Sequence, residues 1–305
     1  MKNNPDYDVI IIGGSYAGMS AALALGRSLR KSLIIDAGLP CNRQIPRSQN
    51  FLTQDGSPPG QIAALARGQL MQYDTIEWEA AVAVESSVSG KWIAVRTEEG
   101  KSFSARKLIL ASGIKDLLPE IGGLAECWGI SAIHCPYCHG YEYKGRKTGI
   151  LANGEAALHY AMLLRRLASE LSIFTNGKAE LGDEALALLK KNDVPVIEKE
   201  LANLQHREGY LSEIVFTDGS THRVDALYTR APFEQHSGIP TMLGCAINEQ
   251  GFIETDPMQK TTVPNVFACG DNCSPMRSVA NAVAAGNLAG AMANAELAKE
   301  DFGLH

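Results

Sequence analysis

The stretch Y-D-V-I-I-I-G-G-S-Y-A-G, residues 7–18, decides the fold. Its first six residues form a β-branched run that predicts a buried strand, and the glycines after it predict a tight turn. The small-residue segment 17–29 predicts a helix, and the apolar residues 32–35 predict a second strand that ends at Asp36. Strand, turn, helix and strand in this order predict a βαβ unit of the nucleotide-binding type.

The turn is similar to the G-x-G-x-x-G loop of dinucleotide-binding proteins, with Ser15 in place of the middle glycine. The first glycine of such a loop permits the tight turn, and the last lets helix and strand pack closely. Serine is small, and its hydroxyl can donate to a phosphate beside the amides of the helix N-terminus. Asp36 lies 18 residues after Gly18, where an acid accepts hydrogen bonds from ribose hydroxyls. We therefore predict a bound dinucleotide.

The pattern recurs about 135 residues later, as a strand at 147–151, a turn at 152–154, a helix at 156–168 and a strand at 171–174. Strands are also expected at 92–96 and 102–112, and another at 265–271 runs into the turn Gly270–Asp271 before a helix at 278–297. The sequence thus predicts an α/β fold with two Rossmann-like, three-layer nucleotide-binding domains.

Composition narrows the function classes. The net charge of -6, from 28 basic and 34 acidic residues, disfavours nucleic acid and anionic membranes as partners. No stretch approaches the roughly 18 apolar residues that span a bilayer, and residues 1–6 lack the apolar core of a signal peptide. We expect a cytoplasmic protein, in which seven cysteines at irregular spacing form no disulfide framework.

The segment I-H-C-P-Y-C-H-G-Y-E, residues 133–142, fits a redox dithiol, a zinc site or a haem attachment site. Zinc needs four converging donors, but His134 abuts Cys135, His139 abuts Cys138, and no second ligand pair is available. Covalent haem needs an oxidising export route, and an inert pair does not explain the intervening proline and flanking polar groups. We predict a redox dithiol and no metal, with His139 accepting and returning the thiol proton.

Taken together, these motifs resemble the low-molecular-weight thioredoxin reductases. The likeness is carried by the first glycine turn, by A-S-G at residues 111–113 and by the C-x-x-C. It extends to C-G-D at residues 269–271, which Arg277 and a small-residue helix follow. The form C-x-x-C-H-G-Y-E, in place of C-x-x-C-D, resembles a branch that includes dithiol oxidases of the gliotoxin, holomycin and romidepsin kinds.

The resemblance implies a homodimer that binds FAD, with an FAD-binding domain at 1–113 and 240–305. A pyridine-nucleotide-type domain at 114–239 is inserted in it and carries the C-x-x-C. The implied FAD-binding residues are Gly13, Gly14, Ser15, Ala17, Gly18, Asp36, Ala111, Gly113, Gly270, Asp271, Arg277, Ser278 and Val279.

The resemblance also implies roles for the catalytic residues. Cys138 is expected to lie against the flavin, Cys135 to meet the substrate sulfur, and His139 to act as acid and base. It leaves open the roles of Cys41, His134 and Glu142.

The second glycine turn departs from the pattern of a pyridine-nucleotide site. Residues 152–157 read A-N-G-E-A-A where G-x-G-x-x-A is expected, and T-N-G-K at 175–178 replaces the H-R-R-x-x-x-R run of NADPH-using relatives. Losing two charge-assisted hydrogen bonds of about 1.5–3 kcal/mol each weakens binding by two to four decades. We therefore expect NADPH to be a poor electron donor or none.

Three hypotheses follow. The first is an FAD-dependent dithiol/disulfide oxidoreductase with oxygen as acceptor or a ferredoxin-like donor. The second is an NADPH-dependent thioredoxin reductase, and the third is a flavin redox sensor without turnover. The expected substrate is a small dithiol or disulfide, or a thioredoxin-like protein.

Overall fold

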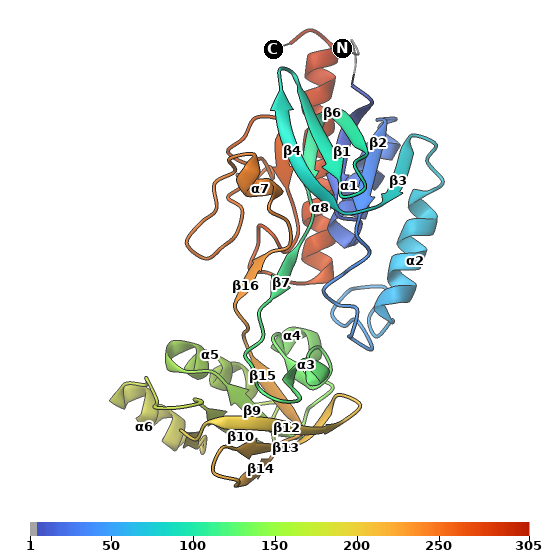
Figure 1. The fold of residues 1–305 in the computed structure, drawn as a ribbon. Coiled ribbons are helices and arrows are strands. Elements are labelled where there is room, and N and C mark those ends of the chain that lie inside the picture. Colours follow the sequence, from blue (N-terminus) through green and yellow to red (C-terminus); the bar gives the residue numbers. More distant parts are fainter. Residues whose placement is uncertain (1–4, 305) are drawn as a thin grey trace. The chain divides into compact units, whose positions relative to one another are not determined.

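The structure is a computed structural model that describes residues 5–304. The chain divides into two compact units: unit 1 holds residues 5–43, 51–115 and 233–304, and unit 2 holds residues 44–50 and 116–232. The chain passes between them through β7 (Ile114–Asp116) and β16 (Phe233–Gln235), which pair as a two-stranded ribbon (Figure 1). The sequence predicts an insertion at 114–239, whereas the structure also places residues 44–50 in unit 2. Which nucleotide each unit holds stays a prediction.

Unit 1 is built on a seven-stranded sheet in the order β3-β2-β1-β6-β5-β4, with β17 also paired to β6. Strands β1, β2, β3, β6 and β17 pair with one another in parallel, while β5 is antiparallel to both β6 and β4. The elements of this unit are β1 (Tyr7–Ile12), α1 (Tyr16–Arg27), β2 (Ser32–Asp36), α2 (Pro59–Leu70), β3 (Ile76–Ala80), β4 (Ala83–Ser89), β5 (Trp92–Thr97), β6 (Ser102–Leu110), α7 (Ile239–Met242), β17 (Val266–Ala268) and α8 (Val279–Asp301).

The strand β1 supplies both faces of the core of unit 1. Because side chains alternate along a strand, Val9 and Ile11 pack with α1 and α8, while Ile10 and Ile12 pack on the opposite face. Helices α1 and α8 lie side by side (Figure 1). Gly286 permits this close approach, because a Cβ there would lie 2.1 Å from the carbonyl oxygen of Ala17.

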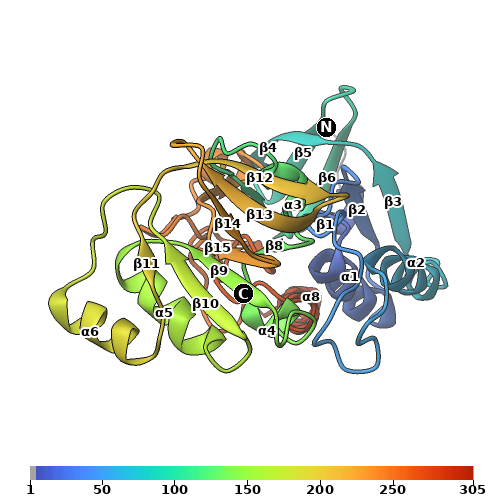
Figure 2. The ribbon, with the colours of Figure 1, turned by 90° about the horizontal axis from the view of Figure 1, so that it is seen from below.

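Unit 2 has a parallel sheet in the order β11-β10-β9-β15-β8 and an antiparallel sheet in the order β12-β13-β14 (Figure 2). Helix α5 packs on one face of the parallel sheet, and β12 and β13 contribute to the core on the other. The elements of this unit are α3 (Leu124–Cys127), β8 (Ala132–Ile133), α4 (Pro136–His139), β9 (Lys147–Leu151), α5 (Gly154–Leu164), β10 (Glu170–Phe174), α6 (Asp183–Lys191), β11 (Val196–Ile197), β12 (Leu201–Arg207), β13 (Tyr210–Phe216), β14 (Thr221–Arg223) and β15 (Ala226–Thr229).

The α/β fold with two Rossmann-like units that the sequence predicts is confirmed. The predicted strands at 7–12 and 147–151 are β1 and β9, and the helix predicted at 156–168 is α5, which begins and ends earlier. The three strands β12–β14 are not among the predicted elements. Within residues 5–304, no helix combines the length and the apolar character that crossing a bilayer requires.

Candidate functional site

The turn between β1 and α1 needs glycine at two positions. Gly13 has a φ of 106°, and a Cβ there would lie 2.2 Å from the carbonyl oxygen of Ala111, at the end of β6. A Cβ on Gly18 would lie 1.8 Å from the carbonyl oxygen of Gly13. The backbone of this turn is therefore drawn tightly against both β6 and α1, as a phosphate-binding turn requires.

The predicted ribose acid lies at the same turn. The carboxylate oxygen Oδ1 of Asp36 accepts a hydrogen bond from the amide of Gly14 at 2.9 Å. Ser15 is the N-cap of α1, and its hydroxyl makes no cap hydrogen bond. Trp78, on β3, closes the other side of the turn, because a Cβ on Gly14 would meet its ring at 2.4 Å.

The second half of the predicted cofactor site follows β17. Gly270 has a φ of 90°, and a Cβ there would approach the Cβ of Ala17 to 3.0 Å, so this turn meets the start of α1. Asp271 lies 3.7 Å from the guanidinium Nε of Arg277. Ser278 caps α8 by accepting from the amide of Asn281 at 3.1 Å, and Val279 is the first residue of that helix.

Three buried polar atoms beside these turns have no hydrogen-bond partner in the described part of the chain: Ser112 Oγ, Gln235 Oε1 and Asn272 Oδ1. Two of these residues are linked, because Gln235 donates to the carbonyl of Asn272 at 2.9 Å, and Asn272 donates in turn to that of Leu110 at 2.9 Å. Orphaned buried polar atoms are rare in proteins, so they suit a polar ligand at this edge of the sheet. The residues present fit a dinucleotide such as FAD.

Sequence reasoning missed Asn272 and Gln235, whereas Ser112 lies in the A-S-G motif at residues 111–113. Asn272 directly follows the Gly270–Asp271 turn, which is the one signal available for it. Gln235 carries no such signal.

The two cysteines of the C-x-x-C are brought together by one helical turn in unit 2. Cys135 is the N-cap of α4, and its carbonyl accepts from the amides of Cys138 at 3.2 Å and His139 at 3.3 Å. Residues three apart in such a turn lie on one face. Both cysteines are partly exposed. Gly140 closes the turn, with its amide 2.8 Å from the carbonyl oxygen of Pro136.

Tyrosine hydroxyls hold the backbone on both sides of this turn. They donate to main-chain carbonyl groups as follows: Tyr143 to Ile130 at 2.9 Å, Tyr160 to His134 at 2.8 Å, and Tyr228 to His139 at 3.5 Å. Burial raises the pKa of Tyr143 to about 12 and raises that of Tyr228 above its ordinary value. Tyr143 and Tyr228 therefore stay protonated at neutral pH and keep the O–H that donates to these carbonyl groups.

The environment of His139 favours the neutral imidazole. Burial lowers its pKa, while the Glu142 carboxylate and the Arg47 backbone oppose that effect. Both ring nitrogens are buried without a well-formed hydrogen bond to the described residues. A neutral imidazole beside Cys138 is suited to accept a proton from a thiol. Glu142 thus acts on His139 through its charge. The centre of the His134 ring lies 6.0 Å from the centre of the Trp128 ring.

Four further cysteines are poor nucleophiles. Burial raises the pKa of Cys127, Cys245 and Cys269, and it raises that of Cys273 to about 12. A protonated thiol does not attack a disulfide, so these residues do not compete with the C-x-x-C. Cys41 is exposed, with its sulfur 3.8 Å from Asp271 Oδ2. Within residues 5–304, no three His, Cys, Asp or Glu side chains gather in a way that would hold a metal ion.

The polar groups of the segment after β10 form hydrogen bonds with other groups of the protein. The Thr175 hydroxyl donates to the Gly177 carbonyl at 2.6 Å, and the Asn176 side-chain oxygen accepts from the Leu201 amide at 2.7 Å. Glu198 accepts from the amide of Ala179 at 2.6 Å. This segment is where a pyridine-nucleotide site holds its ribose or 2′-phosphate.

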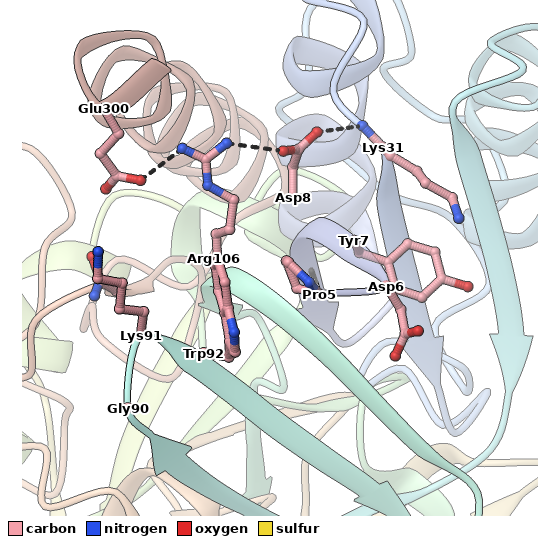
Figure 3. Close-up of a pocket in the computed structure, with 11 residues that line it drawn as sticks. Pro5, Asp6, Tyr7, Asp8, Lys31, Gly90, Lys91, Trp92, Arg106 and Glu300 are labelled. Carbon is pink, nitrogen blue, oxygen red and sulfur yellow. Dashed lines mark hydrogen bonds and ion pairs between the residues drawn. The ribbon is translucent and has the colours of Figure 1, made fainter. Parts of the chain in front are cut away.

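A charged cavity lies at the amino end of the sheet in unit 1 (Figure 3). Arg106 reaches from it to Asp8 at 3.3 Å, Glu300 at 2.8 Å and Asp301 at 2.8 Å. Ligands of α/β sheets bind at the carboxyl ends of the strands, which is the opposite end. We assign this cavity a structural role, because its ion pairs tie the end of α8 to β1 and β6.

The sequence matches the pyridine nucleotide-disulphide oxidoreductase family over residues 7–286. It is 33% identical to a thioredoxin reductase, tcpT, of Claviceps purpurea, covering 97% of this chain and 96% of the relative. Among solved structures, an oxidoreductase from Agrobacterium tumefaciens is 41% identical with a TM-score of 0.90, covering 96% of this chain and 98% of that one. The structure of HlmI is 31% identical with a TM-score of 0.92, covering 97% of this chain and 94% of that one.

Proposed function

Because the chain belongs to the pyridine nucleotide-disulphide oxidoreductase family, we propose that it oxidises an external dithiol through the Cys135–Cys138 pair and a bound FAD, without NADPH as electron donor. The protein is a thioredoxin reductase-like disulfide oxidoreductase, and FAD is the cofactor of such enzymes.

The turns of unit 1 would hold the FAD. Amides at the start of α1 suit its phosphates, and Asp36 suits its ribose hydroxyls. The turn at Gly270 and Asp271 suits the ribityl–phosphate portion. Bound FAD supplies two-electron exchange with the dithiol pair, and we assign oxygen as the final acceptor, leaving as hydrogen peroxide.

The dithiol pair performs two thiol–disulfide exchanges. A substrate thiolate attacks the sulfur of Cys135 in the enzyme disulfide, and Cys138 leaves as a thiolate. The second substrate thiol then attacks the mixed disulfide, which releases the substrate disulfide and leaves Cys135 reduced. His139, neutral at neutral pH, takes the proton of the attacking thiol. A redox sensor has less need of such a proton acceptor.

One observation carries the exclusion of NADPH. The segment 175–178 after β10 offers one lysine, no arginine and no acid, and the polar groups of Thr175 and Asn176 are bound to the protein's own backbone. A nucleotide 2′-phosphate is recognised by bidentate arginine contacts. Without two such contacts, binding is expected to be about two to four decades weaker.

The remaining parts of the proposal concern assembly and partners. We assign FAD to unit 1 and the dithiol to unit 2, and we expect a cytoplasmic homodimer, which size-exclusion chromatography with light scattering tests. The substrate class is a small dithiol, and a thioredoxin-like protein is the competing one. A ferredoxin-like donor would run the same exchange in the reducing direction.

The test is anaerobic. The yellow protein is mixed separately with excess NADPH, NADH and a small dithiol, and bleaching of the flavin band is followed. Bleaching by the dithiol alone supports the proposal, and rapid bleaching by NADPH overturns it in favour of an NADPH-dependent thioredoxin reductase. The control is Cys138→Ser, which should keep FAD and lose dithiol-driven bleaching; full bleaching in this variant would remove the Cys135–Cys138 mechanism.

A further inference from the structure

Asn153 occupies the turn between β9 and α5, at the second position of the degenerate G-x-G-x-x-A pattern. It is the N-cap of α5, an 11-residue helix that begins at Gly154. In a working dinucleotide site the amides of this turn donate to the pyrophosphate. The side chain of Asn153 is therefore placed where it competes with a phosphate for the same donors.

The contacts of Asn153 join two segments that are far apart in the sequence. Its side-chain oxygen Oδ1 accepts from the amide of Gly154 at 2.9 Å and from the amide of Glu180 at 2.8 Å. Its side-chain nitrogen Nδ2 donates to the carbonyl of Lys178 at 2.9 Å. One side chain thus ties the turn at the start of α5 to the segment after β10.

A dinucleotide needs both of these segments. Its pyrophosphate lies at the helix N-terminus, and its ribose lies at the end of the next strand. Here three hydrogen bonds run directly between the two positions. Carboxylates add to the obstacle, because Glu155 lies in the first turn of α5 and Glu198 holds the amide of Ala179.

We propose that Asn153 is a specificity-determining residue, an intramolecular latch that closes the second dinucleotide site of this chain to adenine dinucleotides. The inference rests on the proposed function and deepens it, because it names the group that excludes the pyridine nucleotide. It differs from the missing arginines, which weaken binding to the 2′-phosphate alone. The latch excludes NADH as well as NADPH.

Helix capping alone does not account for these contacts. An N-cap asparagine needs only its side-chain oxygen and an amide in the first turn of its helix. The bonds to Lys178 and Glu180 reach 25 and 27 residues along the chain and contribute nothing to the cap. Serine at this position keeps an N-cap acceptor but is too short to bridge the two segments, so the two roles are separable.

The experiment measures the binding of ADP-ribose to the FAD-loaded protein by isothermal titration calorimetry. ADP-ribose carries the adenosine, the pyrophosphate and the second ribose but no redox group and no 2′-phosphate. The variants are Asn153→Ser, which opens the latch and keeps the cap, and Asn153→Ala, which loses both. The matched control is Asn192→Ala. Asn192 is the C-cap of α6, away from the latch, and the change removes the hydrogen bond of 2.8 Å that its side chain donates to the Leu188 carbonyl.

We expect both Asn153 variants to bind ADP-ribose at least about tenfold more tightly than the wild type and Asn192→Ala. If Asn153→Ser binds ADP-ribose no more tightly than the wild type, the latch is overturned. This holds even if Asn153→Ala binds more tightly, because a gain seen only in the alanine variant reports the loss of the helix cap. Wild-type protein that already binds as tightly as the variants overturns it too. FAD content and thermal unfolding confirm that each variant folds.

The two proposals fail in different ways. Failure of the latch leaves the wild-type flavin bleached by dithiol and not by NADPH. Failure of the proposed function appears as NADPH bleaching of the wild-type flavin, whatever the affinity for ADP-ribose.

Discussion

Replacing Gly286 by alanine tests whether the close packing of α8 on α1 holds the cofactor turn in place. The new Cβ would lie 2.1 Å from the carbonyl oxygen of Ala17, so α8 must move away from α1. In an unobstructed helix the same change stabilises by about 0.5–1 kcal/mol, whereas overpacking a core costs about 1–3 kcal/mol. We expect a net loss of about 1–2 kcal/mol in the free energy of unfolding, together with a lower FAD content.

The matched control is Gly68→Ala in α2, where no atom beyond the chain neighbours and the backbone of its own helix lies within 4 Å of the new Cβ. It should gain about 0.5–1 kcal/mol in urea unfolding, so the same chemical change has opposite signs at the two helices. Gly290→Ala, whose Cβ meets the Ala21 carbonyl at 2.4 Å, should destabilise as well. The double variant should lose less than the sum of the two, because a helix that has already moved has room for both methyl groups. Equal stability of Gly286→Ala and Gly68→Ala would refute the reasoning.

Three further predictions concern the dithiol turn. Because burial lowers the pKa of His139, the unfolded chain binds more protons just below the ordinary histidine value near 6.5. Thermal stability should therefore fall as the pH drops through that window, and His139→Gln should flatten this part of the profile; an unchanged profile would contradict the assignment. Tyr160→Phe leaves the His134 carbonyl without this donor, which should destabilise unit 2 by about 1–3 kcal/mol and slow dithiol oxidation at unchanged FAD content. Gly140→Ala places a Cβ 2.3 Å from the Pro136 carbonyl, so the alkylation rate of the reduced cysteines should change while FAD stays bound; an unaltered rate would show that the turn tolerates the methyl group.

The first βαβ unit was predictable because its signals are local. Residues 7–12 form one apolar run, the glycines follow at once, and Asp36 closes the next strand. The same holds for the C-x-x-C, whose spacing alone brings two thiols together in a single turn. Hydrophobic periodicity and residue spacing reveal such features because they depend only on the local sequence.

The strands β12–β14 were missed although one signal was present. Asp218–Gly219 is a typical hairpin turn, and it joins β13 to β14. The strands themselves are only partly buried, so their apolar residues do not form a clear pattern.

The polar contacts of both candidate sites were beyond sequence reasoning. Tyr228 reaches a carbonyl 89 residues away, and Gln235 reaches one 37 residues away. Nothing in the local pattern of a tyrosine or a glutamine identifies the partner that tertiary packing will bring to it. The sequence shows the loss of the first glycine at Ala152, but it gives no signal for Asn153, whose two bridging bonds go to residues 178 and 180.

Unit 1 is built from chain segments that lie before and after most of unit 2, and this affects the order in which the two units can fold during synthesis. Unit 2 is fully synthesised by residue 232, while β17 and α8 are still to come. Until then the half of β6 from Leu108 to Leu110, which pairs with β17, has an open apolar edge, because β5 covers only the other half. Exposed strand edges invite pairing with other chains. This open edge exposes the nascent protein to pairing with other chains until residue 266 emerges, and the Gly270–Asp271 turn of the proposed flavin site is synthesised later still.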